Sequence, residues 1–316
     1  MANNIFLSII IPVYNSEKTI SLVVSKIIDN MADKYNYETI LVNDNSNDNS
    51  YFECINLSKK YDFVKFINLS KNFGQHNAIL AGLHYTKGDY IIILDDDLQT
   101  DPKNIIDLIS KIEEGFDVVY ANYKSKYHVR FHNLGSKFND LIMHILFQKP
   151  KNIQITSYFI IKRFLVDEIK KYPGPYPYLG GLILQTTNNI GKIDIEHYAR
   201  HFGKSNYSFL KLFRLWVNGF TNFSVKPLRI AFLLGFTFSI IGFLIALFLI
   251  IRKIITPDIV LGWTSILVSL LIFSGIQMIS LGLIGEYVGR IFLSINKQPQ
   301  FVIKEKFNVE NDDKQS

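Results

Sequence analysis

The sequence predicts an α/β protein with a mostly parallel sheet, followed by a pair of membrane-spanning helices. Within the first hundred residues, short apolar segments alternate with segments of helical spacing. This alternation is typical of βαβ units, whose strands form a parallel sheet with right-handed crossovers. After position 228, two long uncharged stretches approach the roughly 20 residues that are needed to cross a bilayer.

Composition supports a membrane-bound protein with anionic partners. The chain has 316 residues, 48% of them hydrophobic, and its mean hydropathy of +0.14 is high for a soluble enzyme. The net charge of +6 and the pI near 9.1 favour phospholipid head groups or phosphorylated substrates. No nucleic-acid motif accompanies this charge, so we expect no nucleic acid partner. Cys54 is the only cysteine, which excludes an intrachain disulfide framework and a cysteine-based metal site.

Each predicted strand ends in a polar cluster. The strands are residues 5–11, 39–42, 64–69 and 91–94, and the intervening helices end near residues 31, 61 and 84. The clusters are Tyr14-Asn15, Asp44, Lys71 with Gln75, and Asp95 with Asp97. Parallel strands bring their carboxyl ends to one edge of the sheet, so the clusters predict a site of nucleotide size. The Gly-rich turns of dinucleotide-binding and P-loop enzymes are missing, so a diphosphate would be held chiefly by a metal and basic side chains.

The acids after residue 94 are the strongest candidates for metal ligands. Alternate residues of an extended chain point the same way, so Asp95 and Asp97 can hold one divalent cation while Asp96 points elsewhere. The alternative is a solvated turn or a helix cap, a role that Asp101-Pro102 fits because it opens the next predicted helix.

Four motifs in this order resemble those of a known family. They are Pro12-Val13-Tyr14-Asn15, Val42-Asn43-Asp44, Asn72-Phe73-Gly74-Gln75-His76 and Asp95-Asp96-Asp97-Leu98-Gln99. They resemble family 2 glycosyltransferases with the GT-A fold. The likeness is strongest to the membrane-bound subgroup that includes dolichol-phosphate mannose synthase, bactoprenol glucosyltransferase and undecaprenyl-phosphate aminoarabinose-type transferases. It extends over almost the whole chain.

The resemblance implies roles for individual residues. It places Asp95 and Asp97 as ligands of Mg²⁺ or Mn²⁺ on the diphosphate, and Gln99 where the sugar or the acceptor phosphate is positioned. The nucleotide site would consist of Pro12, Tyr14, Asn15, Val42, Asp44, Lys71 and Asp96. The family often has Glu directly after Tyr-Asn, whereas here Ser16 precedes Glu17.

Basic residues further along supply candidate phosphate ligands. A run of basic residues in a sequence is usually a solvated surface loop. The resemblance nevertheless implies that Arg130 faces the phosphates, and that the loop containing Arg200, Lys204, Ser205 and Tyr207 closes over the site, with Arg200 on the diphosphate. We therefore expect this set to hold two phosphorylated substrates.

One position departs from the family pattern. Several relatives carry an Asp, often proposed as the catalytic base, where this chain has Thr156. A sugar hydroxyl needs a base to remove its proton in the transition state. A phosphate monoester, with a second pKa of about 6, is already anionic near neutral pH. Thr156 thus favours a lipid-phosphate acceptor or a base supplied elsewhere.

The C-terminal third predicts a membrane anchor. We divide the chain into a catalytic domain (1–206), an interfacial amphipathic helix (207–227), two transmembrane helices within 228–290 (about 230–251 and 263–284) and a cytoplasmic tail (291–316) that is disordered after Pro299. The bias of basic residues places the catalytic domain and both termini on the cytoplasmic side of the cell membrane. Glycines at 282, 285 and 289 would permit close helix contact in a homo-oligomer.

The sequence thus predicts an inverting, metal-dependent glycosyltransferase that moves a sugar from a nucleoside diphosphate sugar to a polyprenyl phosphate, such as undecaprenyl phosphate, for cell-envelope glycans. A first alternative keeps the fold but has a saccharide or lipid-linked saccharide as acceptor. A second is a non-catalytic membrane adaptor that binds nucleotide sugar. The sequence names neither the sugar nor the nucleotide.

Overall fold

The computed structural model describes residues 5–31, 34–123, 153–174, 177–196, 226–255, 262–296 and 298–309. The chain divides into two compact units, one of residues 1–211 with 297–316 and the other of residues 212–296.

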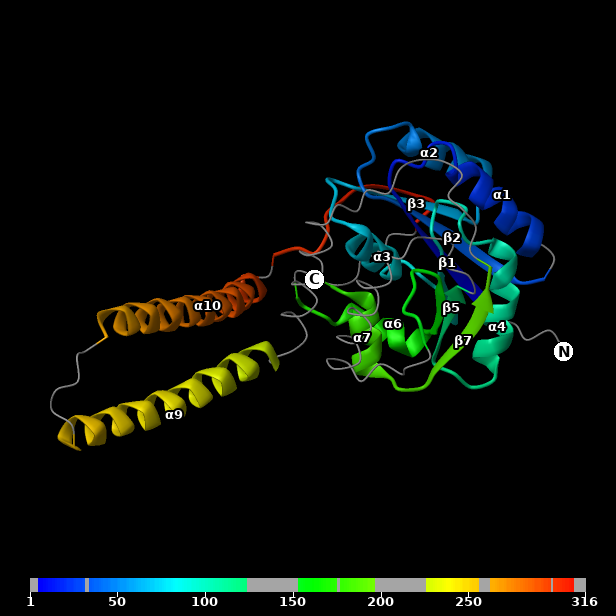
Figure 1. Ribbon diagram of the computed structural model, residues 1–316. Helices are drawn as coiled ribbons and strands as arrows, with labels where there is room; N and C mark the ends of the chain where they lie inside the picture. Colours follow the sequence, from blue (N-terminus) through cyan, green and yellow to red (C-terminus); the bar gives the residue numbers. More distant parts are fainter. Residues whose placement is uncertain are drawn as a thin grey trace. The chain divides into compact units, whose positions relative to one another are not determined.

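The first unit is an α/β domain (Figure 1). Its strands are β1 (Phe6–Val13), β2 (Asn36–Asn43), β3 (Val64–Leu69), β4 (Tyr90–Ile93), β5 (Val118–Tyr123), β6 (Phe159–Lys162), β7 (Ile190–Ile195) and β8 (Ile303–Phe307). Its helices are α1 (Ile20–Met31), α2 (Ser50–Lys60), α3 (Gln75–Leu83), α4 (Ile105–Glu113), α6 (Arg163–Lys170) and α7 (Leu179–Thr186), with a 3₁₀ turn at η1 (Pro102–Asn104).

The strands form one eight-stranded sheet in the order β7-β5-β6-β4-β1-β2-β3-β8. The four strands predicted from the N-terminal half, β4-β1-β2-β3, are all parallel, as their alternation with helices requires. β6 and β8 run antiparallel to their neighbours. The prediction of a mostly parallel α/β sheet is therefore confirmed.

Helices cover both faces of this sheet (Figure 1). Alternate residues of β1 point to opposite layers: Ile9 and Ile11 belong to the core beneath α1, α2 and α4. Ile10 lies under α3, where a Cβ on Gly82 would come within 2.8 Å of it. Because both faces are buried, the central strands are continuous apolar runs, which is the pattern that marked them in the sequence.

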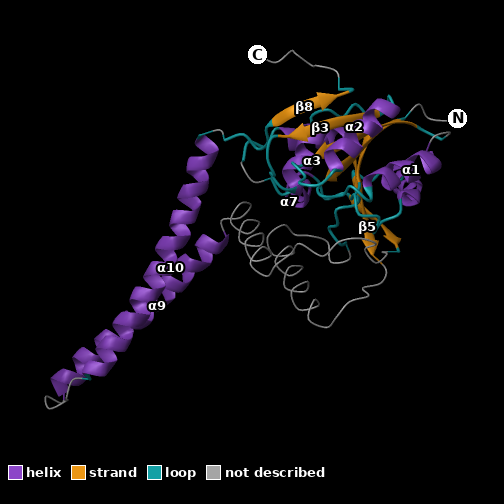
Figure 2. Cartoon of the chain, turned by 90° about the horizontal axis from the view of Figure 1, so that it is seen from above, coloured by secondary structure: helices purple, strands orange, loops and turns teal. Residues whose placement is uncertain are grey.

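The prediction of a disordered tail after Pro299 is wrong for residues 303–307. They form β8, which pairs antiparallel with β3 at the edge of the sheet (Figure 2). Phe307 stacks on Phe66 with ring centroids 6.1 Å apart, and Tyr51 donates a hydrogen bond of 2.6 Å to Glu305. Paired backbone groups and these side-chain contacts order a segment whose composition is that of a solvated tail.

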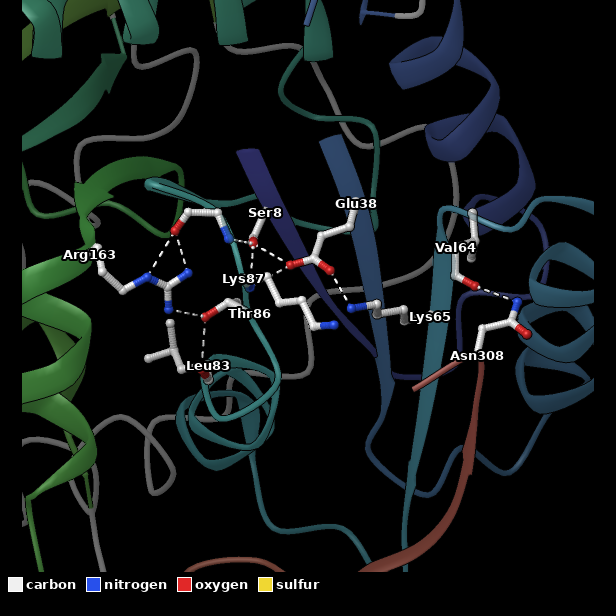
Figure 3. A network of polar contacts seen from close by, with 10 residues as sticks. Ser8, Glu38, Val64, Lys65, Leu83, Thr86, Lys87, Arg163 and Asn308 are labelled. Atoms are coloured by element: carbon white, nitrogen blue, oxygen red, sulfur yellow. Dashed lines mark hydrogen bonds and ion pairs between the residues drawn. The ribbon is translucent and has the colours of Figure 1, made fainter. Parts of the chain in front are cut away.

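A buried ion pair joins the amino-terminal halves of the strands (Figure 3). Glu38 of β2 pairs with Lys65 of β3, and the two side chains are only 4% and 11% exposed. Glu38 also accepts hydrogen bonds from Ser8 Oγ at 2.5 Å and from the Lys87 backbone N–H at 2.6 Å. The network therefore ties three strands to the turn that precedes β4.

The second unit contains two long helices, α9 (Lys226–Ile255) and α10 (Trp263–Ile295), which run antiparallel and contact each other (Figures 1 and 2). Among the described residues, one stretch, Ile272–Leu293, is long and apolar enough to cross a membrane, and a shorter apolar helical stretch covers Ala231–Ile245. Large apolar side chains such as Phe232, Phe243 and Ile279 are 69–74% exposed within the chain. The interfacial helix was predicted at 207–227; residues 207–225 lie outside the described residues, and Lys226 and Pro227 begin α9.

Candidate functional site

The candidate site lies at the carboxyl edge of the parallel strands. Register pairs Val13 of β1 with Asn43 of β2, and Asn43 with Asn68 of β3. Ile93, the last residue of β4, pairs with Ile10 of β1. The strand ends and the polar loops that follow them therefore meet at one edge, as the sequence predicted.

The three acids follow β4, which ends at Ile93; the chain bends from Asp96 onward, and Leu98 has a positive φ of 60°. The three residues thus lie outside the strand, but Asp96 is directed to the loop after β1 and Asp95 to Gln75 and Ser157, so Asp96 does point elsewhere than Asp95. A cation shared by Asp95 and Asp97 stays a prediction. Each carboxylate contacts a different segment of the domain, as the next paragraphs describe.

Asp95 is held by two neutral donors from different elements. Gln75 Nε2, at the start of α3, donates at 2.9 Å, and Ser157 Oγ donates to the other oxygen. Burial, together with repulsion from Asp97 and Asp96, raises the pKa of Asp95 to about 7, although the two hydrogen bonds act in the opposite direction. The charged form is thus costly in the protein alone, which is the situation that a bound cation relieves.

Asp96 contacts the loop after β1. It accepts hydrogen bonds from the Tyr14 backbone N–H at 3.0 Å and from Ser16 Oγ. Burial raises its pKa to about 6, against these hydrogen bonds. Asp96 therefore fixes the Tyr14-Asn15 loop, and Ser16, at the position where the family often has Glu, supplies one of its donors.

Asp97 accepts the backbone N–H of Gln99 at 3.1 Å, which closes a local turn. Burial, followed by the Asp95 carboxylate, raises the pKa of Tyr123, a residue of β5; Asp97 acts in the same direction. The carboxylates of Asp95 and Asp97 therefore both raise the pKa of the Tyr123 phenol.

Asp44 organises the neighbouring loop of residues 70–75. Its two oxygens accept the backbone N–H groups of Phe73 at 2.7 Å and Gly74 at 2.8 Å. Gly74 has φ +89°, a conformation that a side chain would strain, and it precedes α3. Asp44 is 3% exposed, and burial raises its pKa. Its main contacts here are with the loop, while the predicted nucleotide contact stays a prediction.

The remaining predicted nucleotide residues fall into two groups. Tyr14, Asn15 and Lys71 are exposed at the edge of the sheet. Pro12 and Val42 are buried in β1 and β2, so their side chains lie beneath the edge. Arg130, Arg200, Lys204, Ser205 and Tyr207 lie outside the described residues, and their roles stay predictions.

Thr156 is engaged with backbone. Its hydroxyl lies 3.0 Å from the carbonyl oxygens of both Ala121 and Tyr158, between β5 and β6. Position 156 thus carries a hydroxyl in place of a carboxylate base, and this hydroxyl also hydrogen-bonds to Tyr123. Sequence reasoning missed the adjacent Ser157, and also Tyr123, because neither belongs to a polar cluster at a predicted strand end.

The acids fit a cation that is shared with a ligand. No group of three or more His, Cys, Asp or Glu side chains arranged for a metal occurs among the residues that the structure describes. Oxygens of Asp95 and Asp97 could supply only part of an octahedral Mg²⁺ or Mn²⁺ shell. Diphosphate oxygens and water would complete it, as is usual for Mg²⁺ in phosphate sites.

Comparisons with known proteins identify the family. Residues 8–170 match the model of the family described as Glycosyl transferase family 2. An uncharacterized glycosyltransferase of Bacillus subtilis, YkcC, is 32% identical over 98% of this chain and 97% of its own length. An undecaprenyl-phosphate 4-deoxy-4-formamido-L-arabinose transferase of Proteus mirabilis is 31% identical over 97% of this chain and 95% of its own.

Solved structures of other proteins share the fold of this chain. Glucosyl-3-phosphoglycerate synthase from Mycobacterium tuberculosis, in complex with Mn²⁺ and uridine-diphosphate-glucose, superposes with a TM-score of 0.54 at 15% identity, covering 69% of this chain and 77% of that one. At this identity the likeness concerns the fold alone.

Proposed function

Since the chain belongs to glycosyl transferase family 2 and has the GT-A fold, we propose that it transfers a sugar from a nucleoside diphosphate sugar to a polyprenyl phosphate, with inversion at the anomeric carbon. The observation that carries the proposal is the cluster of Asp95, Asp96 and Asp97 at the carboxyl edge of the sheet. The full-length likeness to undecaprenyl-phosphate transferases supports the acceptor class.

A divalent cation bound by Asp95 and Asp97 would offset the charge that develops on the departing diphosphate. The chain's own contribution is to hold these carboxylates in place: Gln75 and Ser157 orient Asp95, and the turn at Gln99 orients Asp97. Asp44 and Asp96 hold the two loops that flank them. A phosphate acceptor attacks without a strong base, which fits a Thr156 hydroxyl bonded to backbone.

The reaction belongs at a membrane surface. β8 lies in the same sheet as the N-terminal strands, so residues before α9 and after α10 are on the same side of any bilayer. The chain between them must then cross an even number of times. Because α10 contains a stretch long enough to span, we propose that α9 crosses as well and that the two helices form a hairpin. The resulting anchor would keep the site near the lipid head groups.

The test is sugar transfer in detergent from a panel of labelled nucleotide sugars to undecaprenyl phosphate, with and without Mg²⁺ or Mn²⁺. We expect a lipid-extractable product that depends on the cation and is lost in Asp97→Asn, by at least about a hundredfold. The matched control is Asp107→Asn, which removes an exposed acid of α4 and leaves transfer unchanged.

The alternatives give different outcomes in the same assay. Transfer of the labelled sugar to a saccharide but not to lipid phosphate would show that the acceptor is a saccharide and not a polyprenyl phosphate. Nucleotide binding without turnover of any donor on either acceptor would contradict the enzyme and favour a membrane adaptor. The proposed homo-oligomer is tested separately by the mass of the purified particle.

A further inference from the structure

The segment that follows α10 is built into the α/β domain at several points. Gln300 Nε2 donates to the carbonyl oxygens of Tyr172 at 2.7 Å and Gly174 at 2.6 Å. Val302 accepts the backbone N–H of Ser70 at 2.8 Å. β8 then pairs with β3, and Asn308 Nδ2 donates to the carbonyl oxygens of Ser58 and, at 3.1 Å, Val64 (Figure 3). We call residues 300–308 the C-terminal strap.

The strap meets the domain next to the loop of residues 70–75. Ser70, the first residue of this loop, is held by the strap. Phe73 and Gly74, in its middle, are held by Asp44. Gln75, at its end, bonds to Asp95. The loop therefore joins the strap directly to the carboxylate that we place in the site.

Aromatic and cation contacts extend the strap along α3. Phe301 lies 5.6 Å from the ring of His84, and Lys306 Nζ lies 5.0 Å from the ring centroid of Tyr85. Since α3 begins with Gln75, the strap contacts the residues just past the far end of this helix as well as the loop before it. Movement of the loop relative to the sheet is thus restricted at both ends of α3.

We propose that the C-terminal strap is a positioning element for the reaction. Gln300 anchors the strap to the carbonyl oxygens of Tyr172 and Gly174, and this anchor places Val302, two residues further on, where it accepts the N–H of Ser70. The strap thereby fixes the loop of residues 70–75 and the orientation of Gln75 toward Asp95. The proposal rests on the proposed function, because it assigns the loop to donor binding. It gives the segment after the membrane helices a role in the site as well as in the sheet.

The test compares Gln300→Glu and Gln300→Ala with Lys304→Ala in the full chain. Gln300→Glu keeps the shape of the side chain but replaces the donor with an acceptor that faces two carbonyl oxygens. Lys304→Ala changes an exposed residue of the same strap. Hydrogen exchange is measured at the amides of residues 70–74, and KM for the donor and kcat are measured separately.

For both Gln300 variants we expect roughly tenfold faster exchange at Ser70 and a donor KM raised by a similar factor, with a smaller change in kcat. The Lys304 variant should match the wild type. Unchanged Ser70 exchange, or a lowered thermal midpoint with an unchanged KM, would overturn the proposal. The exchange measurement needs no substrate, so its result stands even if the assigned acceptor is wrong.

Asn308→Ala provides a second comparison with the Gln300 variants, at the other end of the strap. It loosens the far end of the strap, where Asn308 bonds to two carbonyl oxygens. We expect faster exchange in β8 but near wild-type exchange at Ser70 and an unchanged donor KM. Equal changes in KM from Asn308→Ala and from a Gln300 variant would contradict a specific role for the loop end of the strap.

Discussion

Asp95 depends on Ser157 and Gln75, one residue on each oxygen, for its orientation. We predict that Ser157→Ala lowers kcat/KM by roughly tenfold and raises the concentration of divalent cation needed for half-maximal activity, because one hydrogen bond to the carboxylate is lost. Direct Mn²⁺ binding, followed by electron paramagnetic resonance, should weaken in parallel. Ser157→Thr keeps the hydroxyl and should restore both properties. Unaltered cation binding in Ser157→Ala would contradict this role.

The raised pKa values of Asp95 and Asp96 predict a pH dependence of stability. Burial is the main cause, and the folded values are about 7 and about 6, compared with about 3.9 in an unfolded chain. A carboxyl with a raised folded pKa stabilises the fold below its unfolded pKa, and this contribution is lost as pH rises through the folded value. The free energy of unfolding without metal should therefore fall between about pH 4 and pH 7, by a few kcal/mol.

The measurement is the thermal midpoint of wild type and Asp95→Asn across that pH range, in chelator. The difference between the two proteins should grow with pH, in favour of the variant, because the amide does not ionise. Added Mn²⁺ at pH 7.5 should raise the midpoint of the wild type alone. A constant difference across the range would show that Asp95 titrates normally in the fold.

For individual residues, the sequence predicted where the site lies better than it predicted which contacts its side chains make. Strand ends identified Asp44, Asp95, Asp96 and Asp97 because parallel strands must finish at one edge. Which way each carboxylate points depends on where β4 stops and on the turn at Leu98, and neither is encoded by alternation. Ser157 comes from a segment more than 60 positions away, and only folding brings it to Asp95.

At the scale of elements, the buried Glu38–Lys65 pair connects β2 to β3 and, through Ser8 and Lys87, to β1 and the turn before β4. We predict that Glu38→Ala lowers the free energy of unfolding by about 3–5 kcal/mol, since it leaves a buried ammonium without its partner. Thermal or chemical unfolding measures this loss. The double variant Glu38→Met/Lys65→Met should cost less than Glu38→Ala alone, because no buried charge remains. A larger loss in the double variant would contradict this explanation.

β8 forms where the sequence predicted a disordered tail. Residues 303–307 carry three charges in five positions, Lys304, Glu305 and Lys306, which is the composition of a solvated tail. Charges are also what edge strands carry on their open side. The apolar residues of this segment also do not alternate regularly. The pairing with β3 shifts register between Glu305 and Ile303, and Phe307 stacks on Phe66 while Phe301 contacts His84, just past α3.

At the scale of the whole molecule, a shared sheet restricts how the chain can cross a membrane. Strands from before α9 and after α10 pair in one sheet, so the ends of the second unit must emerge on the same side of the bilayer. Segment 197–225 has no uncharged run near the roughly 20 residues required to span, since Arg200, Lys204, Lys211 and Arg214 interrupt it. A single crossing by α10 is therefore incompatible with β8, although α10 alone contains a stretch that meets the length criterion.

This argument predicts the labelling of single cysteines. Cys54 is fully buried and burial raises its pKa, so the native thiol should not react. In intact cells, a membrane-impermeant maleimide should label Asp258→Cys, which lies in the sequence between the two helices, but should label Ser316→Cys only after permeabilisation. Labelling of Ser316→Cys but not Asp258→Cys would mean a single crossing and would require β8 to leave the sheet. Protection of both sites would mean that neither helix crosses, and the anchor would then lie along the surface.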